Sequence, residues 1–137
     1  MRDTTTHRRR VIIWEWVDAR GRHGALSGAG LQDAQLAKID ERLDRLRELG
    51  PLDRQKTQGY IFPFKGELKK MKIRGTVAVR PIVVLGPFDT EWEVTLLLVA
   101  REENNRLLPS MQAVASSGRD RLSEVLDEPH RRRQRYE

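Results

Sequence analysis

The sequence predicts an α+β domain in which a mostly antiparallel sheet of about four strands is packed by helices. Two segments carry apolar residues at helical spacing, and four runs are rich in β-branched, aromatic or other apolar residues. Their order along the chain is β-α-β-β-β-α, which is typical of the α+β class. With 137 residues the chain has the size of one domain. We therefore expect a single domain over residues 11–128, between a basic arm at 1–10 and a basic tail at 129–137.

The first half of the predicted domain contains one strand and one helix. Residues 11–17 are β-branched and aromatic, which indicates a strand, and the four glycines of 18–30 indicate a loop. An apolar stripe at three- and four-residue spacing predicts a helix over 32–49, with Asp33 as its cap and Gly50-Pro51 as its end. We expect the stripe to lie in the core. It consists of Leu36, Ile39, Leu43, Leu46 and Leu49.

Three strand-like runs follow the irregular segment 51–66. They cover 67–74, 77–85 and 93–101 and are separated by turns that contain glycine. The third run is almost continuously apolar, as expected for a central strand covered on both faces. Pro81 within the second run indicates a sheet edge or a bulge.

A second helix is predicted to start at Ser110, whose hydroxyl can cap it, and to stop at Pro129. The eight residues after Pro129 include four arginines, so we expect a disordered tail. Trp14 and Trp16 share one face of the first strand and fit either a core position or a platform for base stacking.

Positive charge is concentrated in three segments. Residues 1–10 and 129–137 each carry +3, residues 65–80 carry +5, and the remaining chain is −5, although the whole chain is only +6. Such concentration favours a polyanionic partner, nucleic acid in particular, and a solvated charged surface is the alternative.

Several chemistries are excluded or disfavoured by composition. Without cysteine the chain has no disulfide and no thiol nucleophile. It has no phosphate-binding glycine loop, its three histidines lack metal-ligand spacing, and its serines lack a motif that places a histidine beside them. We therefore expect no metal and no cofactor. No apolar run is long enough for a membrane span, which predicts a soluble, cytoplasmic protein.

The segment KKMKIR at 69–74 places cations at alternate positions of a strand. If Met71 and Ile73 face the core, then Lys70, Lys72 and Arg74 share the other face. Arg80 would return beside them on the next strand, and Arg101 would join them from the end of the last strand. Five convergent cations would stabilise a phosphorane, and like charges would lower a lysine pKa enough for it to act as a general base. The same cations would also suit binding of a phosphate backbone or an acidic protein without chemistry.

These residues resemble a known family. From about 33 to 126 the chain is similar to the RelE/HigB-type toxins of bacterial and phage toxin–antitoxin systems, which have a strand with Lys-x-Lys-x-Arg and an arginine on the next strand. Residues 99–103 resemble the family's segment at the end of the last strand. Residues 106–109 then lead into the final helix, as in many phage-derived members.

The resemblance implies a role for each matching residue. Lys70 and Lys72 take the positions of the general base and a phosphate contact, Arg74 and Arg80 those of phosphate-stabilising arginines, and Arg101 that of the arginine near the leaving group. Lys69 and Tyr60 are further expected substrate contacts. The family tyrosine that stacks on the mRNA base is missing after Arg101, and Tyr60, Phe88 or Tyr136 would have to replace it.

The resemblance therefore implies a ribosome-dependent mRNA endoribonuclease. Its 2′-OH attack would need no metal, and the enzyme would be neutralised by an antitoxin, expected to be a helix-turn-helix protein with a segment that covers the cations. The alternative is a non-catalytic protein of the same fold, either a ParE-like gyrase inhibitor or a phage nucleic-acid-binding protein.

Overall fold

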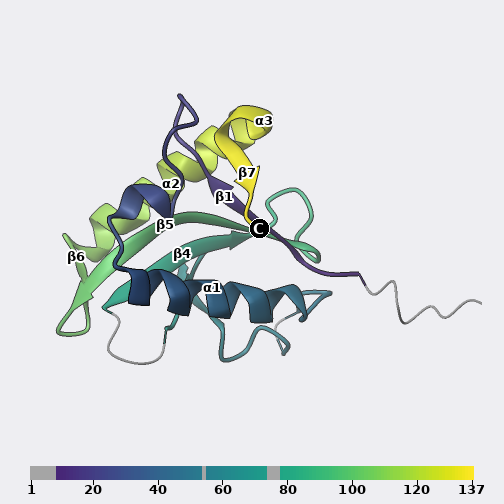
Figure 1. Ribbon diagram of the computed structural model, residues 1–137, viewed down its shortest axis with the longest axis horizontal. Helices are drawn as coiled ribbons and strands as arrows, with labels where there is room; N and C mark the ends of the chain where they lie inside the picture. Colours follow the sequence, from purple (N-terminus) through teal and green to yellow (C-terminus); the bar gives the residue numbers. More distant parts are fainter. Residues whose placement is uncertain (1–8, 54, 74–77) are drawn as a thin grey trace, which may run out of the picture.

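The protein is an α+β domain built on one mixed sheet with helices on both faces (Figure 1). The computed structural model describes residues 9–53, 55–73 and 78–137. The sheet has seven strands in the order β2-β3-β4-β5-β1-β7, with β6 paired to the end of β5. The helices are α1 (Asp33–Arg47), α2 (Met111–Asp127) and α3 (Pro129–Arg132), with a 3₁₀ turn, η2, at Ser27–Ala29. The strands are β1 (Ile12–Trp16), β2 (Ile61–Lys65), β3 (Leu68–Met71), β4 (Val79–Leu85), β5 (Glu93–Glu103), β6 (Arg106–Leu108) and β7 (Arg133–Arg135).

The predicted α+β class is confirmed, but the predicted number of about four strands is wrong, because the sheet has seven strands and is mixed. Strands β2 to β5 form an antiparallel meander, whereas β1 pairs with β5 in parallel. A parallel pair needs a long crossover connection, which begins here with α1 and continues through the meander. The strands that the sequence did not predict are β2, β6 and β7, all of which lie at the margins of the sheet.

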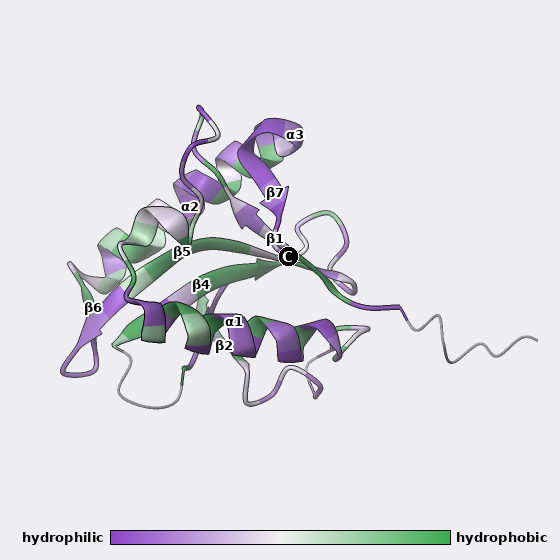
Figure 2. Ribbon diagram, in the orientation of Figure 1, coloured by the Kyte–Doolittle hydropathy of each residue, from purple (hydrophilic) through white to green (hydrophobic). Residues whose placement is uncertain are grey.

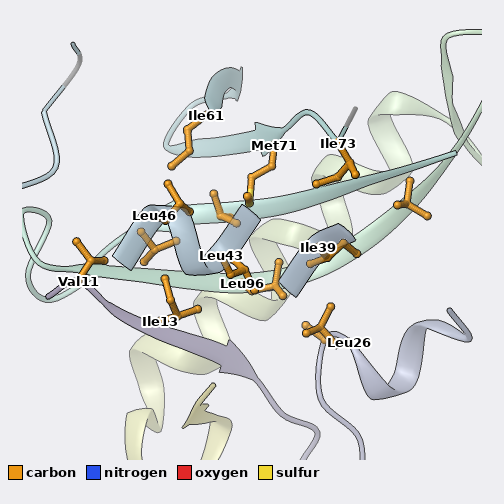
Figure 3. Close-up of a cluster of buried hydrophobic side chains, with 14 of the residues drawn as sticks. Val11, Ile13, Leu26, Ile39, Leu43, Leu46, Ile61, Met71, Ile73 and Leu96 are labelled. Atoms are coloured by element: carbon orange, nitrogen blue, oxygen red, sulfur yellow. The ribbon is translucent and has the colours of Figure 1, made fainter. Parts of the chain in front are cut away.

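Helix α1 packs one face of the sheet and forms the larger core (Figure 3). Ile39, Leu43 and Leu46 are fully buried, as the stripe predicted, whereas Leu36 is 40% exposed. Their side chains meet those of the sheet strands, among them Met71 and Leu96. The cap is Gln32, which forms a capping box with Gln35, rather than the predicted Asp33, which is the first residue of the helix.

Helix α2 covers the opposite face and forms a second core. Ser110 caps it as predicted, since its hydroxyl accepts a hydrogen bond of 3.0 Å from the Ala113 amide. Gly118 lets the helix approach the sheet closely, because a Cβ at this position would lie 3.0 Å from Leu68 Cδ1. Figure 2 shows β4 and β5 as mostly hydrophobic ribbons, consistent with a sheet covered on both sides. The second core comprises Leu68, Ile82, Val84, Leu97, Ala100, Val114 and Leu122.

A bulge in β5 changes which side chains face each helix. Ile82 pairs with Leu98, but the next residue, Val83, pairs with Leu96, so Leu97 is an extra residue in β5. Both Leu97 and Leu98 consequently contact the α2-side core. Because successive side chains alternate, one inserted residue exchanges the two faces for every position that follows. The bulge lies one residue beyond Pro81, which had indicated an edge or a bulge.

The C-terminal segment is ordered, so the prediction of a disordered tail is wrong. Strand β7 pairs antiparallel with β1, and its hydrophilic ribbon lies at the margin of the sheet (Figure 2). The Arg133 guanidinium stacks 3.9 Å from the centre of the Trp14 ring and lies 3.3 Å from Glu93 Oε1. Arg132 makes a 3.0 Å ion pair with Glu124, which also accepts a hydrogen bond from Trp16 Nε1. These tail arginines therefore hold the strand in place.

Deletion of residues 129–137 is expected to lower the free energy of unfolding by roughly 2–4 kcal/mol, because it uncovers β1 and leaves Glu93 and Glu124 without their arginines. Urea unfolding followed by tryptophan fluorescence measures this. Arg131→Ala is the control, since its ion pair with Glu128 is exposed and should contribute less than about 1 kcal/mol. Equal stability of the deletion variant and the full chain would contradict the prediction.

Candidate nucleic-acid interface

Lys70 and Lys72 lie on the opposite face of the sheet from Met71 and Ile73, as the sequence predicted. Met71 and Ile73 are buried in the α1-side core. Lys70 pairs with Ile82, a residue of the α2-side core, so it lies on the α2 face of the sheet. The Lys72 ammonium lies 4.9 Å from the centre of the Phe62 ring, and Phe62 is itself paired with Lys70. Arg74 lies outside the described residues.

Arg80 lies on the same face as Lys70 and is held by a carboxylate. It pairs with Ala100 of the α2-side core, and its guanidinium makes a 2.8 Å ion pair with Glu102. The two side chains are only 17% and 18% exposed, and Arg80 also donates to the Val79 carbonyl at 2.9 Å. We call Lys70, Lys72 and Arg80 the cation face.

Glu102 was not among the predicted site residues. The sequence signal for Glu102 is its position directly after Arg101 in a predicted strand. Successive side chains of a strand point to opposite faces, so if one of the two faces the α1 side, the other faces the cation face.

Arg101 lies on the other side of the sheet, so the predicted convergence of five cations is wrong. It pairs with Val79 of the α1-side core, and its guanidinium donates to the Gly30 carbonyl at 3.3 Å. The cause is the bulge at Leu97. Strict alternation from Leu96 would place Arg101 on the cation face, and the extra residue places Glu102 there instead.

Lys69 and Tyr60 also lie away from the cation face. Lys69 pairs with Val83 on the α1 side and lines a separate pocket of about 690 Å³ beside the loop that precedes β2. Tyr60 packs against the α1-side core, with the Arg42 guanidinium 4.8 Å from the centre of its ring. Of the seven predicted site residues, the structure brings together Lys70, Lys72 and Arg80.

An open pocket of about 620 Å³ adjoins the cation face. Lys70 and Glu102 line it on the sheet side, together with the aromatic ring of Phe64 from β2. The N-terminal end of α2 contributes Ser110 and Met111. The pocket thus combines an ammonium group, an arginine-bound carboxylate and an aromatic ring within one concave surface.

The other aromatic residues proposed as substitutes for the family tyrosine are engaged elsewhere. Phe88 has the Arg133 guanidinium 4.9 Å from its ring centre. The Tyr136 hydroxyl donates to Asp40 at 2.5 Å, and burial, followed by this hydrogen bond, raises the pKa of the Tyr136 phenol. Phe64 lines a pocket together with Lys70. The sequence did not indicate this residue, because it lies between Pro63 and Gly66 in a segment predicted to be irregular.

The charges of the cation face are only partly compensated. Within the described part of the chain, no carboxylate lies within ion-pair distance of Lys70 or Lys72, whereas Arg80 is paired with Glu102. Two unpaired ammonium groups beside half-buried aromatic rings form a surface suited to phosphate and base. No His, Asp or Glu cluster among the described residues is placed to hold a metal ion, and none of their helices could span a membrane.

Comparison of the chain with protein-family models, curated proteins and solved structures finds no match. The resemblance to RelE/HigB toxins therefore stays a prediction from the sequence motif. Two lysines and one arginine of that motif, Lys70, Lys72 and Arg80, lie on the cation face.

Proposed function

We propose that the protein is an RNA-directed toxin of the RelE/HigB type that binds single-stranded RNA across the cation face and cleaves it without a metal. The observation that supports this best is the shared face of Lys70, Arg80 and Glu102, two of which line one pocket. The three side chains can supply three roles: the Glu102 carboxylate a proton acceptor, the Arg80 guanidinium an electrostatic stabiliser, and the Lys70 ammonium a proton donor.

The proposed reaction is an internal transfer within the RNA. Glu102 accepts the proton of the 2′-OH while the 2′-oxygen bonds to the adjacent phosphorus. The bond from phosphorus to the 5′-oxygen breaks, and Lys70 donates a proton to that leaving oxygen. The products are a 2′,3′-cyclic phosphate and a 5′-hydroxyl. Arg80 stabilises the phosphorane charge, and Lys72 contacts a neighbouring phosphate from its position over Phe62.

Primer extension on translated message after brief induction tests the proposal. Discrete cuts within codons, unaffected in vitro by EDTA, are the expected result. Intact message in growth-inhibited cells, or cleavage that EDTA stops, would contradict it. We further propose that a neutralising antitoxin covers the cation face, in which case co-expression with the adjacent reading frame should restore growth and give a stable complex.

A second candidate function is RNA binding without cleavage. It is favoured by the ion pair that occupies Arg80 and by the position of Arg101 on the opposite face. Under this alternative the wild-type chain retains RNA of intact length, whereas the proposed enzyme releases fragments that end in a cyclic phosphate.

Both candidates predict how RNA affinity depends on salt. Lys70→Ala and Lys72→Ala should each reduce the slope of log affinity against log salt by about 0.7, the value of one contact to a single-strand phosphate. Fluorescence anisotropy of labelled single-stranded RNA across a salt series measures the slope. Lys69→Ala removes a neighbouring lysine from the opposite face and is the matched control. An equal reduction in the control would show that the RNA does not follow the cation face.

A further inference from the structure

We propose that the pocket beside the cation face holds one guanine base of the RNA, stacked against Phe64 and recognised by Asn105 and Arg106. This inference rests on the proposed function for its ligand, single-stranded RNA. It concerns the part of the pocket that the proposed cleavage does not use.

A tight hairpin brings the two recognising residues to the pocket. Strands β5 and β6 pair Glu103 with Arg106, which leaves Asn104 and Asn105 as the two turn residues. Both have positive φ, 51° and 61°, the conformation of a type I′ turn and one that asparagine adopts more readily than most residues. The ladder and the turn together fix the backbone that carries the Asn105 amide and the Arg106 guanidinium.

The walls of the pocket are apolar and exposed. Leu108 and Met111 are 39% and 45% exposed, and both line this pocket with Phe64. Exposed large apolar side chains gathered in a concave surface mark a binding site. A flat ligand with π-faces suits these walls, because sequence-specific RNA recognition places unstacked bases on aromatic and apolar side chains.

The polar groups at the pocket favour guanine over adenine. Asn105 and Arg106 line the pocket with exposed side chains that offer N–H donors. The pocket carboxylate, Glu102, is already bound to Arg80. Guanine presents two adjacent acceptors, O6 and N7, to which arginine binds with both arms, whereas adenine presents an N6 donor beside N7. Lys70 is placed to contact the phosphate of the same nucleotide.

Binding of short RNAs with a single guanine tests the inference. Fluorescence anisotropy is compared for RNAs that carry guanine, inosine, 7-deazaguanine or adenine at that position, at one salt concentration and with the 2′-OH replaced by 2′-methoxy to prevent cleavage. Inosine should bind like guanine because it keeps O6 and N7. RNA with 7-deazaguanine, which lacks the N7 acceptor, should bind roughly 5- to 100-fold more weakly than RNA with guanine, and so should RNA with adenine at that position.

Variants assign the effect to this pocket. Arg106→Ala should remove most of the difference between guanine and 7-deazaguanine, and Arg106→Lys should restore part of it. Phe64→Ala should weaken all four RNAs together, whereas Leu126→Ala, which removes an exposed apolar side chain outside the pocket, should weaken none.

The outcomes separate the inference from the function on which it rests. Wild-type binding that is equal for all four bases, or a base preference that survives in Arg106→Ala, would overturn the guanine pocket while RNA binding stands. Absence of RNA binding by the wild-type chain would overturn both.

Discussion

Lys70→Ala is expected to reduce RNA cleavage by roughly 10²–10³-fold, the usual cost of removing one group that stabilises developing charge in a transition state. Lys70 lines the pocket with Glu102 and lies on the face that carries Arg80. Binding should fall far less, because one phosphate contact to single-stranded RNA changes affinity only modestly. Single-turnover cleavage of a labelled RNA at saturating protein, together with anisotropy of the uncleaved RNA, separates the two quantities.

Two further variants show whether the three residues act as one site. Glu102→Gln keeps the shape of the side chain but removes its proton acceptor, and Arg80→Ala removes the positive partner of that acceptor. Both should lose cleavage to a similar degree, and combining either with Lys70→Ala should add little, because groups that act as a unit are not additive.

The controls come from the opposite face of the sheet. Lys69→Ala and Arg101→Ala remove cations that are adjacent in sequence to Lys70 and Glu102 but point toward the α1 side. Near wild-type cleavage is expected for both. If Arg101→Ala abolished cleavage while Glu102→Gln did not, the reaction would take place on the α1 face and the proposed site would be wrong.

The alternation of β3 could be predicted because it depends on neighbours in sequence. Burial of Met71 and Ile73 sets the direction of Lys70 and Lys72, and no distant residue is needed for that inference. The face of the sheet on which Arg101 lies could not be predicted from alternation along its own strand. It depends on one extra residue in an apolar run, and Leu97 differs in no way from its leucine neighbours. A bulge is decided by how two strands pair, which the sequence of one strand does not contain.

The ordered C-terminal segment escaped prediction for a related reason. Four arginines near a chain end indicate a solvated tail when they are considered alone. In the fold, Arg132 and Arg133 reach Glu124 and Glu93 and stack near the rings of Trp16 and Trp14. These contacts join the two ends of the sequence. Part of the positive charge that suggested a polyanionic partner is therefore used within the protein, which leaves Lys70 and Lys72 as the stronger candidates for phosphate contact.

Strand β2 illustrates the opposite effect, in which a local signal was misleading. Pro63 lies at its centre and Gly59 and Gly66 flank it, so the sequence predicts an irregular segment. The strand is the outermost one beside β3, and an edge strand tolerates a proline because its free side needs no N–H donor. Strand β2 is part of the candidate site, because its Phe62 ring lies against the Lys72 ammonium and its Phe64 lines the pocket.

Under the proposed function, the two faces of the sheet would have different roles. The α1 face holds the larger core, while the α2 face is covered by its helix over only part of its area and carries the cation face beyond it. Stability and RNA recognition should consequently respond to different substitutions, although a single sheet supports both.

Leu43→Ala should lower the free energy of unfolding by about 2–5 kcal/mol, because it removes a fully buried side chain from the middle of α1 and leaves a cavity against the sheet. Leu36→Ala makes the same chemical change in the same helix, but Leu36 is 40% exposed, so a loss of at most about 1 kcal/mol is expected. Urea unfolding with unchanged m-values measures both.

The same pair of variants tests whether the core and the cation face are independent. Below its unfolding transition, Leu43→Ala should bind RNA with nearly wild-type affinity, since its side chain lies across the sheet from Lys70. Equal destabilisation by both substitutions would contradict the placement of α1. A weakened affinity in folded Leu43→Ala would instead show that packing on the α1 side controls the geometry of the cation face through the sheet.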